Sequence, residues 1–386
     1  LLFPFYILVI SGLAFWYKKK KCKTNPEYKY FVPGLIAKII GGLYFAYIYT
    51  FIYYGGDTTN YFESTIPMLN LASKDFGTFV KIMMGNNSLE CYSQFDRFTG
   101  YPMYYLKPNS FAVVRLSTPF VFLGCKSFYL STILLATITY SGLWKLFQVF
   151  VREYPKHMKL AAIGTLFMPS VLFWGSGIMK DSLMISALGW FIYAFYSLVK
   201  RKKNDPFFKY YIHIVISVYI MLIIKPFNFY AVTVCVAIWF VFELIAKIKN
   251  QVLRVLMYPV MLIIVSLTGM YMFLFASQIA GGYYSSTNAM LEQAVVIQQD
   301  LTRDAYGENS FDIGKFDPTI SGILSKFPAA VNAGFFRPYP WEVSNFLMAL
   351  SAAEKFFLLL LTIFVLIRVR TNYILASFVK KPYIFM

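Results

Sequence analysis

An acidic residue stands where a long apolar stretch near the start of the chain ends. The segment reads FIYYGGDTTNYFES, and Asp57 follows its two glycines as soon as the apolar run stops. A pair of charged residues, Lys180 and Asp181, lies between two further apolar stretches in PSVLFWGSGIMKDSLMIS. Almost no loop connects these two stretches. An ionisable residue near membrane depth is costly to keep, so these three residues are candidates for function.

Two further polar groups follow the same pattern. LIIKPFNFY places Lys225 directly before Pro226, with Asn228 two residues further on. The last group combines a cation, an acid and two aromatic rings just before the final apolar stretch. Its members, in GFFRPYPWEVSN, are Arg337, Tyr339, Trp341 and Glu342.

Each group also has a purely structural interpretation. Lys180 is suited to reach lipid headgroups while Asp181 caps the helix that begins at SLMIS. Lys225 before a proline is compatible with a simple helix end, and Asp57 with an ordinary helix N-cap. The rings and prolines of FRPYPWE are typical of an interfacial anchor, although anchoring needs neither the arginine nor the glutamate.

The residue types favour transfer of a group from a phosphorylated carrier. A carboxylate such as Asp57 can take the proton from an acceptor hydroxyl as the hydroxyl attacks an anomeric carbon. Glu342 is the alternative base, or else it orients Arg337. The chain's two histidines lie away from these groups and its four cysteines show no CxxC spacing. Neither a catalytic triad nor a zinc site is therefore predicted.

Cations and aromatic rings complete the inventory. Lys180 and Arg337, with Lys225 as a further candidate, can stabilise the negative charge of a phosphate leaving group. Tyr339 and Trp341 can stack on the face of a sugar. Without a P-loop or a GxGxxG motif to bind a nucleotide, the simplest substrate is a sugar attached to a lipid phosphate or pyrophosphate.

Composition indicates which elements must position these residues. Hydrophobic residues make up 58% of the chain and charged residues 14%, against about 25% charged in a soluble domain. Apolar stretches of roughly 20 residues can each cross a bilayer as a helix. We therefore predict an all-α polytopic membrane protein with about nine or more transmembrane helices, near 1–17, 35–54, 127–150, 160–178, 182–199, 209–224, 229–246, 255–277 and 346–367.

The basic residues indicate the orientation. If successive spans cross the membrane in alternate directions, one set of connectors lies on a single side. These connectors are KKKKCKTNPEYK, VREYPKHMK, VKRKKNDPFFK, KIKNQVLR and RVR. This is the positive-inside pattern, so that side is predicted to be cytoplasmic and the polar groups to lie on the extracytoplasmic face of the cytoplasmic (inner) membrane. The net charge of +18 then reflects membrane topology, and no nucleic-acid partner is predicted.

Two large outer connectors are predicted, 55–126 and 278–345. The segment NSFAVVRLSTPFVFLGCKS in the first is interrupted by Arg115 and Pro119, and we expect it to be an interfacial helix with its apolar face towards the lipid. The second is expected to hold a helix near 287–303. One membrane domain, 1–386, is predicted; because the chain begins with Leu1 and stops soon after a basic pair, both ends are expected to be incomplete.

The layout resembles the GT-C class of membrane glycosyltransferases. In that class an acidic residue in the first large outer loop acts as the catalytic base and polyprenyl-phosphate sugars are the donors; the matching residue here is Asp57. PSVLFWGSGIMKDSL and FRPYPWE also resemble segments of membrane proteins from bacterial surface-polysaccharide gene clusters. Many members carry two adjacent acids in that loop, whereas Thr58 and Thr59 follow here and Glu63 is the next acid. No metal or other cofactor is therefore predicted.

The predicted partners are a lipid-linked sugar donor, a saccharide acceptor and the lipid bilayer. A polymerase that joins lipid-linked repeat units, as in O-antigen assembly, would have the same composition but release a ladder of products. A transporter or flippase for lipid-linked oligosaccharides predicts charged residues within spans and access from both sides. A structural subunit without activity predicts that Asp57→Asn leaves function intact.

Overall fold

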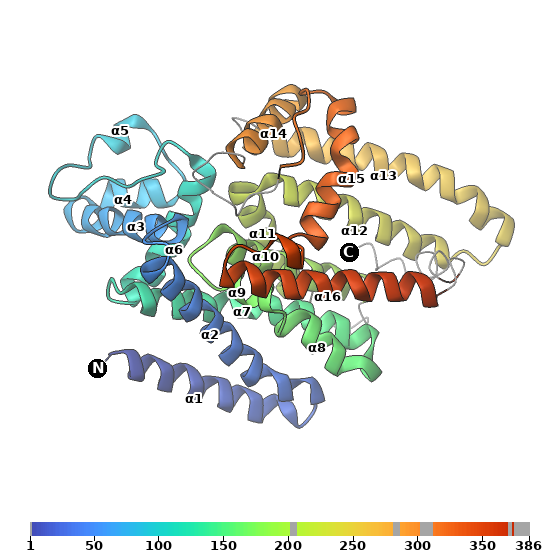
Figure 1. The fold of residues 1–386 in the computed structure, drawn as a ribbon, viewed down its shortest axis with the longest axis horizontal. Coiled ribbons are helices and arrows are strands. Elements are labelled where there is room, and N and C mark those ends of the chain that lie inside the picture. The colour runs from blue at the N-terminus through green and yellow to red at the C-terminus, as the bar shows by residue number, and fades with distance from the viewer. Residues whose placement is uncertain (1, 201–206, 281–285, 302–311, 370–372, 374–386) are drawn as a thin grey trace. The chain divides into compact units, whose positions relative to one another are not determined.

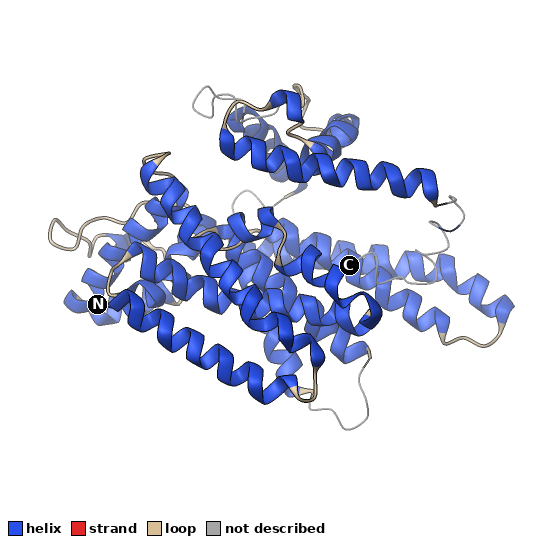
Figure 2. Cartoon of the chain, turned by 60° about the horizontal axis from the view of Figure 1, so that its bottom comes forward, coloured by secondary structure: helices blue, strands red, loops and turns tan. Residues whose placement is uncertain are grey.

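The computed structural model describes residues 2–200, 207–280, 286–301, 312–369 and 373. These residues form helices and loops, with no strand among them (Figures 1 and 2). In chain order the helices are α1 (Leu2–Cys22), η1 (Pro26–Tyr30), α2 (Phe31–Phe51), α3 (Asp57–Lys74), α4 (Phe76–Met83), α5 (Leu89–Tyr92), α6 (Pro108–Leu123), α7 (Phe128–Glu153), η2 (Pro155–His157), α8 (Met158–Leu166), α9 (Pro169–Trp174), α10 (Lys180–Val199), α11 (Phe208–Ile224), α12 (Pro226–Ala246), α13 (Gln251–Ala280), α14 (Thr287–Leu301), α15 (Ile320–Phe336), η5 (Pro340–Glu342) and α16 (Phe346–Arg368).

The all-α prediction is confirmed for the described residues. Six helices in that part of the chain are long and apolar enough to cross a membrane: α2 with η1, α7, α10, α12, α13 and α16. The remaining predicted spans fall on α1, on the 17-residue apolar helix α11, and on α8 with α9. The full path of nine spans stays a prediction.

One predicted span is not a continuous helix. The segment 160–178 forms two short helices, α8 and α9, and then an irregular stretch from Gly175 to Met179. The break falls at Met168, whose backbone is extended (φ −67°, ψ 123°) directly before Pro169. A proline disfavours the helical conformation in the residue that precedes it, so Pro169 begins a new helix instead of continuing the first.

The predicted interfacial segment is a helix, α6, but its burial is not one-sided. Six consecutive residues, 110–115, are buried, and at 100° per residue they cover the whole circumference. Helices α3, α7 and α11 pack around it. The expectation of a single apolar face towards lipid is therefore wrong for α6, because neighbouring helices enclose it.

The second outer connector is described in part, since 281–285 and 302–311 lie outside the described residues. The helix predicted near 287–303 is present as α14. Contacts within the chain form two compact units, Leu1–Lys225 and Pro226–Met386, and the single membrane domain 1–386 stays a prediction. Each unit is described by itself.

In the first unit, α7 and α10 run parallel and very close together. Arg152 near the end of α7 donates hydrogen bonds to Tyr193 and Ser197 near the end of α10, at 3.2 Å each. At mid-helix, a Cβ built on Gly189 would overlap the carbonyl group of Gly142. The two helices thus begin at the same end of the unit.

Helices α2 and α11 run antiparallel to α7 and α10, so their C-terminal ends lie near the starts of α7 and α10. The Tyr140 hydroxyl of α7 donates a hydrogen bond of 2.8 Å to the carbonyl of Phe31 at the start of α2, and Gly42 further along α2 faces Thr132 near the start of α7. Helix α11 packs on α10, and Lys225, which directly follows α11, lies beside the start of α10. The C-terminal ends of α2 and α11 therefore lie at the end where α7 and α10 begin.

The second unit is built from helix pairs. Helices α12 and α13 pack against each other (Figure 1). The ring centroids of Phe242 and Tyr258 lie 5.7 Å apart. Helix α15 packs on α16, where the Lys355 ammonium donates a hydrogen bond of 3.0 Å to the carbonyl of Gly334. The η5 turn between these two helices carries the last predicted site group.

The close approach of α7 and α10 can be tested with two glycine substitutions. Gly189→Ala and Gly12→Ala both gain helix propensity of about 1 kcal/mol. At Gly189 the new methyl group would overlap the backbone of Gly142, whereas at Gly12 no atom lies within 4 Å of it. We expect Gly189→Ala to be less stable than Gly12→Ala by about 1–3 kcal/mol. Thermal unfolding in detergent measures this, and equal stabilities would contradict the packing.

Candidate functional site

Two glycines and a threonine position Asp57. Gly55 and Gly56 have φ angles of 135° and 147°, and a Cβ on Gly56 would lie 2.7 Å from the ring of Tyr49, so a side chain is excluded there. Gly56 is the N-cap residue of α3, and the Thr59 hydroxyl accepts a hydrogen bond from its N–H at 3.0 Å. Asp57 is therefore not the N-cap, and its exposed carboxylate is available for other partners.

Tyrosines surround this carboxylate. The Tyr104 hydroxyl donates a hydrogen bond of 2.7 Å to Asp57 Oδ1 and accepts one of 3.3 Å from the Asn60 amide. The ring of Tyr104 lies 5.0 Å from that of Tyr61. Burial raises the pKa of the Tyr61 hydroxyl well above its ordinary value, and the negative charge of Asp57 adds to the effect. The Tyr61 phenol is thus neutral, and the Tyr104 phenol is a hydrogen-bond donor to the Asp57 carboxylate.

The predicted cation Lys180 belongs to the same place. Its ammonium donates a hydrogen bond of 2.9 Å to the hydroxyl of Ser110, which is buried on α6. Electrostatic attraction links Lys180 to Asp57 and to Asp181, and Lys225 repels it. An acid from the start of α3 and a cation from the start of α10 are therefore brought together through α6.

Asp181 and Lys225 form an ion pair of 2.5 Å, with 37% and 27% of their side chains exposed. Asp181 lies in the first turn of α10 and Lys225 directly follows α11. An acid at a helix N-terminus and a cation at a C-terminus each complement the helix dipole. Lys225 does stand at a helix end, as the structural interpretation expects, but Asp181 does not cap α10, because Met179 is the N-cap residue and no side chain caps it. The pair keeps both charges beside Lys180.

A buried lysine supports the stretch that leads into α10. Lys38 of α2 has no exposed surface, and its ammonium donates a hydrogen bond to the carbonyl of Gly175, which follows the last residue of α9. Carbonyl groups at the end of a helix lack partners within the helix, and a cation there is favourable. Residues 175–178, the backbone just before Lys180, are buried as well.

We call this assembly the Asp57 cluster: Asp57, Tyr61, Tyr104, Ser110, Lys180, Asp181 and Lys225. Sequence reasoning named its four charged members but missed the two tyrosines and the serine. The only signal for Tyr104 was the aromatic run GYPMYY in the first outer connector, and nothing marked Ser110. Glu63 is exposed and lies six residues along α3, about 120° around the helix from Asp57.

The other predicted residues lie in the second unit. Arg337 makes a two-pronged ion pair with Glu342, with hydrogen bonds of 3.1 and 2.6 Å, and the Tyr339 N–H donates a third of 2.9 Å to the same carboxylate. The hydrogen bonds from Arg337 hold the pKa of the Glu342 carboxyl below its usual range, and Glu342 raises that of Arg337. Asn228 lies in the first turn of α12.

Two rings beside this ion pair form a flat platform. The rings of Tyr339 and Trp341 stack with centroids 4.7 Å apart and planes 16° from parallel. The Tyr339 hydroxyl is tied to Asn332 by a hydrogen bond of 2.8 Å, while Trp341 is 73% exposed. An exposed indole held by stacking is suited to contact a sugar ring or the interface of a bilayer.

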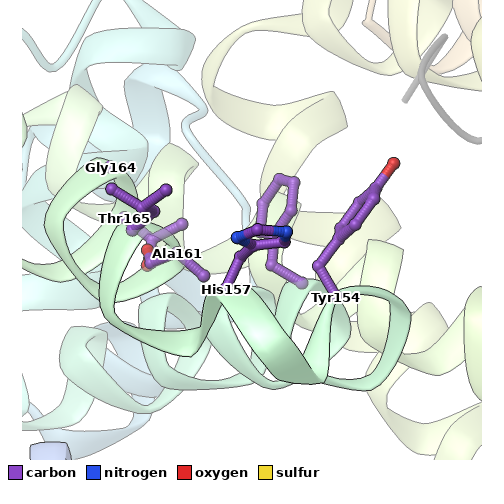
Figure 3. Close-up of a pocket in the computed structure, with 7 residues that line it drawn as sticks. Tyr154, His157, Ala161, Gly164 and Thr165 are labelled. Atoms are coloured by element: carbon purple, nitrogen blue, oxygen red, sulfur yellow. The ribbon is translucent and has the colours of Figure 1, made fainter.

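A hollow of about 310 Å³ lies elsewhere in the first unit, at the turn from α7 into α8. Tyr154, His157, Ala161, Gly164 and Thr165 line it in a row (Figure 3). It belongs to the end of α7 opposite the Asp57 cluster, since the cluster lies where α7 and α10 begin. Its lining carries no acid and no lysine or arginine, so we do not assign the predicted chemistry to it.

The described residues contain no group of three or more His, Cys, Asp or Glu side chains arranged to hold a metal ion. Asp57 and Asp181 are the carboxylates of the Asp57 cluster, and Tyr104 and Lys225 respectively bond them. The prediction that no metal or other cofactor is needed stays a prediction.

Fold and apolar helices together define an all-α integral membrane protein. No family model, no curated protein and no solved structure matches the chain. Function has to be argued from the residues themselves.

The ion pair that joins α10 to α11 can be measured by a double-mutant cycle. We expect Asp181→Asn and Lys225→Met to show a coupling energy of about 0.5–1 kcal/mol, because both side chains are partly exposed. Lys74→Met breaks a different ion pair, with Asp96 at 2.8 Å, and should add to Asp181→Asn within about 0.5 kcal/mol. Strict additivity of Asp181→Asn and Lys225→Met in unfolding measurements would show that the pair is not formed.

Proposed function

We propose that this protein is a membrane glycosyltransferase that moves a sugar from a polyprenyl phosphate or pyrophosphate to a hydroxyl of a saccharide acceptor. One observation carries the proposal. The carboxylate of Asp57 lies in the same cluster as the Lys180 ammonium and the phenols of Tyr61 and Tyr104, beside the ends of apolar helices. A carboxylate can act as the base, and an ammonium can stabilise the phosphate leaving group, in sugar transfer from a lipid phosphate.

In the proposed reaction, Asp57 accepts the proton of the acceptor hydroxyl as its oxygen attacks the anomeric carbon. The bond from that carbon to the phosphate oxygen breaks, and the carrier leaves with its electron pair as a lipid phosphate or pyrophosphate. Lys180 stabilises the negative charge that grows on this leaving group. Tyr104 holds the Asp57 carboxylate in place through its hydrogen bond.

Ser110 and Asp181 act on the cations of the cluster. The hydrogen bond to Ser110 fixes the position of the Lys180 ammonium. Asp181 already neutralises Lys225, so Lys180 is the better candidate for the phosphate and Lys225 the secondary one. A group held by a fixed hydrogen bond loses less freedom when a ligand binds.

The second unit has its own candidate group for binding a sugar phosphate. Glu342 is held by three hydrogen bonds and its pKa lies below the usual range, which makes it a weak base. We therefore propose that Glu342 orients Arg337 and that Asp57 is the base. Arg337 would bind a phosphate oxygen, and the platform of Tyr339 and Trp341 would stack on a sugar ring.

We propose that the Asp57 cluster faces the extracytoplasmic side of the cytoplasmic membrane. If the nine predicted spans cross the membrane in alternate directions, the C-terminal ends of α2 and α11 lie on the same side of the membrane as the starts of α7 and α10. Their arrangement in the first unit supports that path. Basic connectors then lie on the opposite side, as the positive-inside rule requires.

Substitution of the acid tests the reaction directly. Asp57→Asn keeps the shape of the side chain but removes the base, so we expect transfer from polyprenyl-phosphate sugars to fall by a factor of about 10²–10⁴ in kcat. Arg337→Gln should lower turnover in the same assay. Glu90→Gln, at an exposed acid of the same connector, is the matched control and should behave as the unmodified protein. Near-normal transfer by both Asp57→Asn and Arg337→Gln, at equal protein levels, would refute the assignment.

The length of the product separates transfer from polymerisation. A transferase adds a single sugar to its acceptor, whereas a polymerase that joins lipid-linked repeat units yields a ladder of lengths. Both reactions would use Asp57 and Lys180 in the roles given above. Gel separation of the saccharides made by the purified protein distinguishes them.

A transporter for lipid-linked oligosaccharides is the second candidate, and two observations favour it. Lys38 is a fully buried cation within the apolar helix α2, and the irregular stretch after α9 interrupts the helical path beside it. Broken helices and buried charges mark substrate pathways in transporters. The carbonyl of Gly175, however, already accepts a hydrogen bond from Lys38.

Lys38→Met distinguishes the two candidates. For a transferase we expect lower stability, by about 1–3 kcal/mol because a buried carbonyl loses its partner, with kcat per folded molecule within a few-fold of the unmodified protein. For a transporter the substitution should abolish movement of the lipid-linked saccharide between leaflets. Flipping and transfer assays on the same proteoliposomes decide between them.

A further inference from the structure

Arg115 is a buried cation whose partner is missing from the described part of the protein. Its residue is 7% exposed, in the middle of α6, and its Nη1 atom has no hydrogen-bond partner among the described residues. A buried charge without a partner costs several kcal/mol. Arg337 shows the usual solution in this chain, a two-pronged ion pair with Glu342.

No described acidic group compensates the charge of Arg115. The groups that interact electrostatically with its guanidinium are the phenols of Tyr105 and Tyr219. Burial raises the pKa of Tyr105 to about 12, so that phenol is neutral at physiological pH, and its hydroxyl already donates a hydrogen bond of 2.9 Å to the carbonyl of Ser88. Arg115 therefore faces a neutral phenol at Tyr105, and no described acid pairs with it.

An exposed loop covers the guanidinium. A Cβ built on Gly85, which has a φ of 109°, would lie 3.0 Å from Arg115 Nη1, so the backbone comes this close only without a side chain. Residues 84–86 are exposed on their outer side. The loop between α4 and α5 is thus a thin layer between the buried cation and the surroundings.

The same loop holds a second buried polar atom without a partner. The Asn87 side-chain oxygen has no hydrogen-bond donor among the described residues, although its amide donates a bond of 3.4 Å to the carbonyl of Tyr105. A ligand that offers a negative oxygen to Arg115 and a hydroxyl to Asn87 would satisfy both. A protonated phosphate, or a phosphate esterified to a polyol, offers both a negative oxygen and a hydroxyl.

We propose that Arg115, with Asn87, forms a binding site for a phosphate group that enters beneath the Gly85 loop. The guanidinium binds the phosphate oxygens and Asn87 accepts a hydrogen bond from a hydroxyl of the ligand. Ser110 and Arg115 are five residues apart, about 7.5 Å along α6, so this site is distinct from the Asp57 cluster. The inference goes beyond the proposed transfer reaction and does not depend on it.

Thermal unfolding of the full chain in detergent tests the proposal, with inorganic phosphate as the probe and sodium chloride of equal ionic strength as the reference. We expect the unfolding temperature to rise with phosphate concentration. Arg115→Met should weaken the apparent affinity at least tenfold, and Arg115→Lys, which keeps the charge but not the planar fork, should give an intermediate value. Arg97→Met, at an exposed arginine of the same connector, should respond as the unmodified protein.

A second arm identifies the source of the phosphate. The same proteins are compared in phosphatidylcholine nanodiscs with and without phosphatidic acid, whose headgroup is a phosphate monoester. A response to inorganic phosphate that Arg115→Met removes supports a site for a free phosphate group. A response confined to phosphatidic acid and removed by Arg115→Met supports a site for a lipid headgroup. No response to either probe, or an equal response of Arg115→Met and the unmodified protein, overturns the proposal.

Discussion

The contact between Lys38 and Gly175 is the constraint on which the first unit depends. An ammonium group with no exposed surface is tied to a carbonyl at the point where α9 has ended. Without it, α2 would bury an unsatisfied charge and the backbone after α9 would lose a partner, and both losses are costly away from water. The contact holds the irregular stretch 175–179 against α2, and α10 begins where that stretch ends.

The position of α10 in turn decides where the charges meet. Its parallel packing on α7 brings its first turn, with Lys180 and Asp181, to the end of the unit where α11 finishes. Helix α6 connects α10 with α3. The Lys180 ammonium of α10 bonds to Ser110 of α6, and Lys180 is attracted to Asp57 at the start of α3. Most charges there are neutralised in pairs or stand at favourable helix ends. The Asp57 carboxylate and the Lys180 ammonium remain beside the phenols of Tyr61 and Tyr104.

Sequence reasoning located the helices well because apolar stretches of the right length have few alternatives in a membrane. The predicted segments 182–199 and 209–224 differ from α10 and α11 by no more than two residues at either end. It failed at the α8–α9 break, because α8 ends at Leu166 and Pro169 begins α9 within one apolar stretch of the sequence. It also misjudged α6, since Arg115 and Pro119 suggested the membrane surface although neighbouring helices enclose both sides of it.

By itself, the sequence determined the class of protein, the approximate helix bounds and the charged residues worth examining, because hydrophobic length and charge are local properties. Tertiary structure alone decided which of those charges are neighbours, since residues from α3, α6, α10 and α11 meet only after the helices have packed. It also supplied the neutral members, Tyr61, Tyr104 and Ser110, and singled out Arg115. A tyrosine or serine is common in any membrane protein, and only its hydrogen bonds to a charged neighbour distinguish it from the others of its kind.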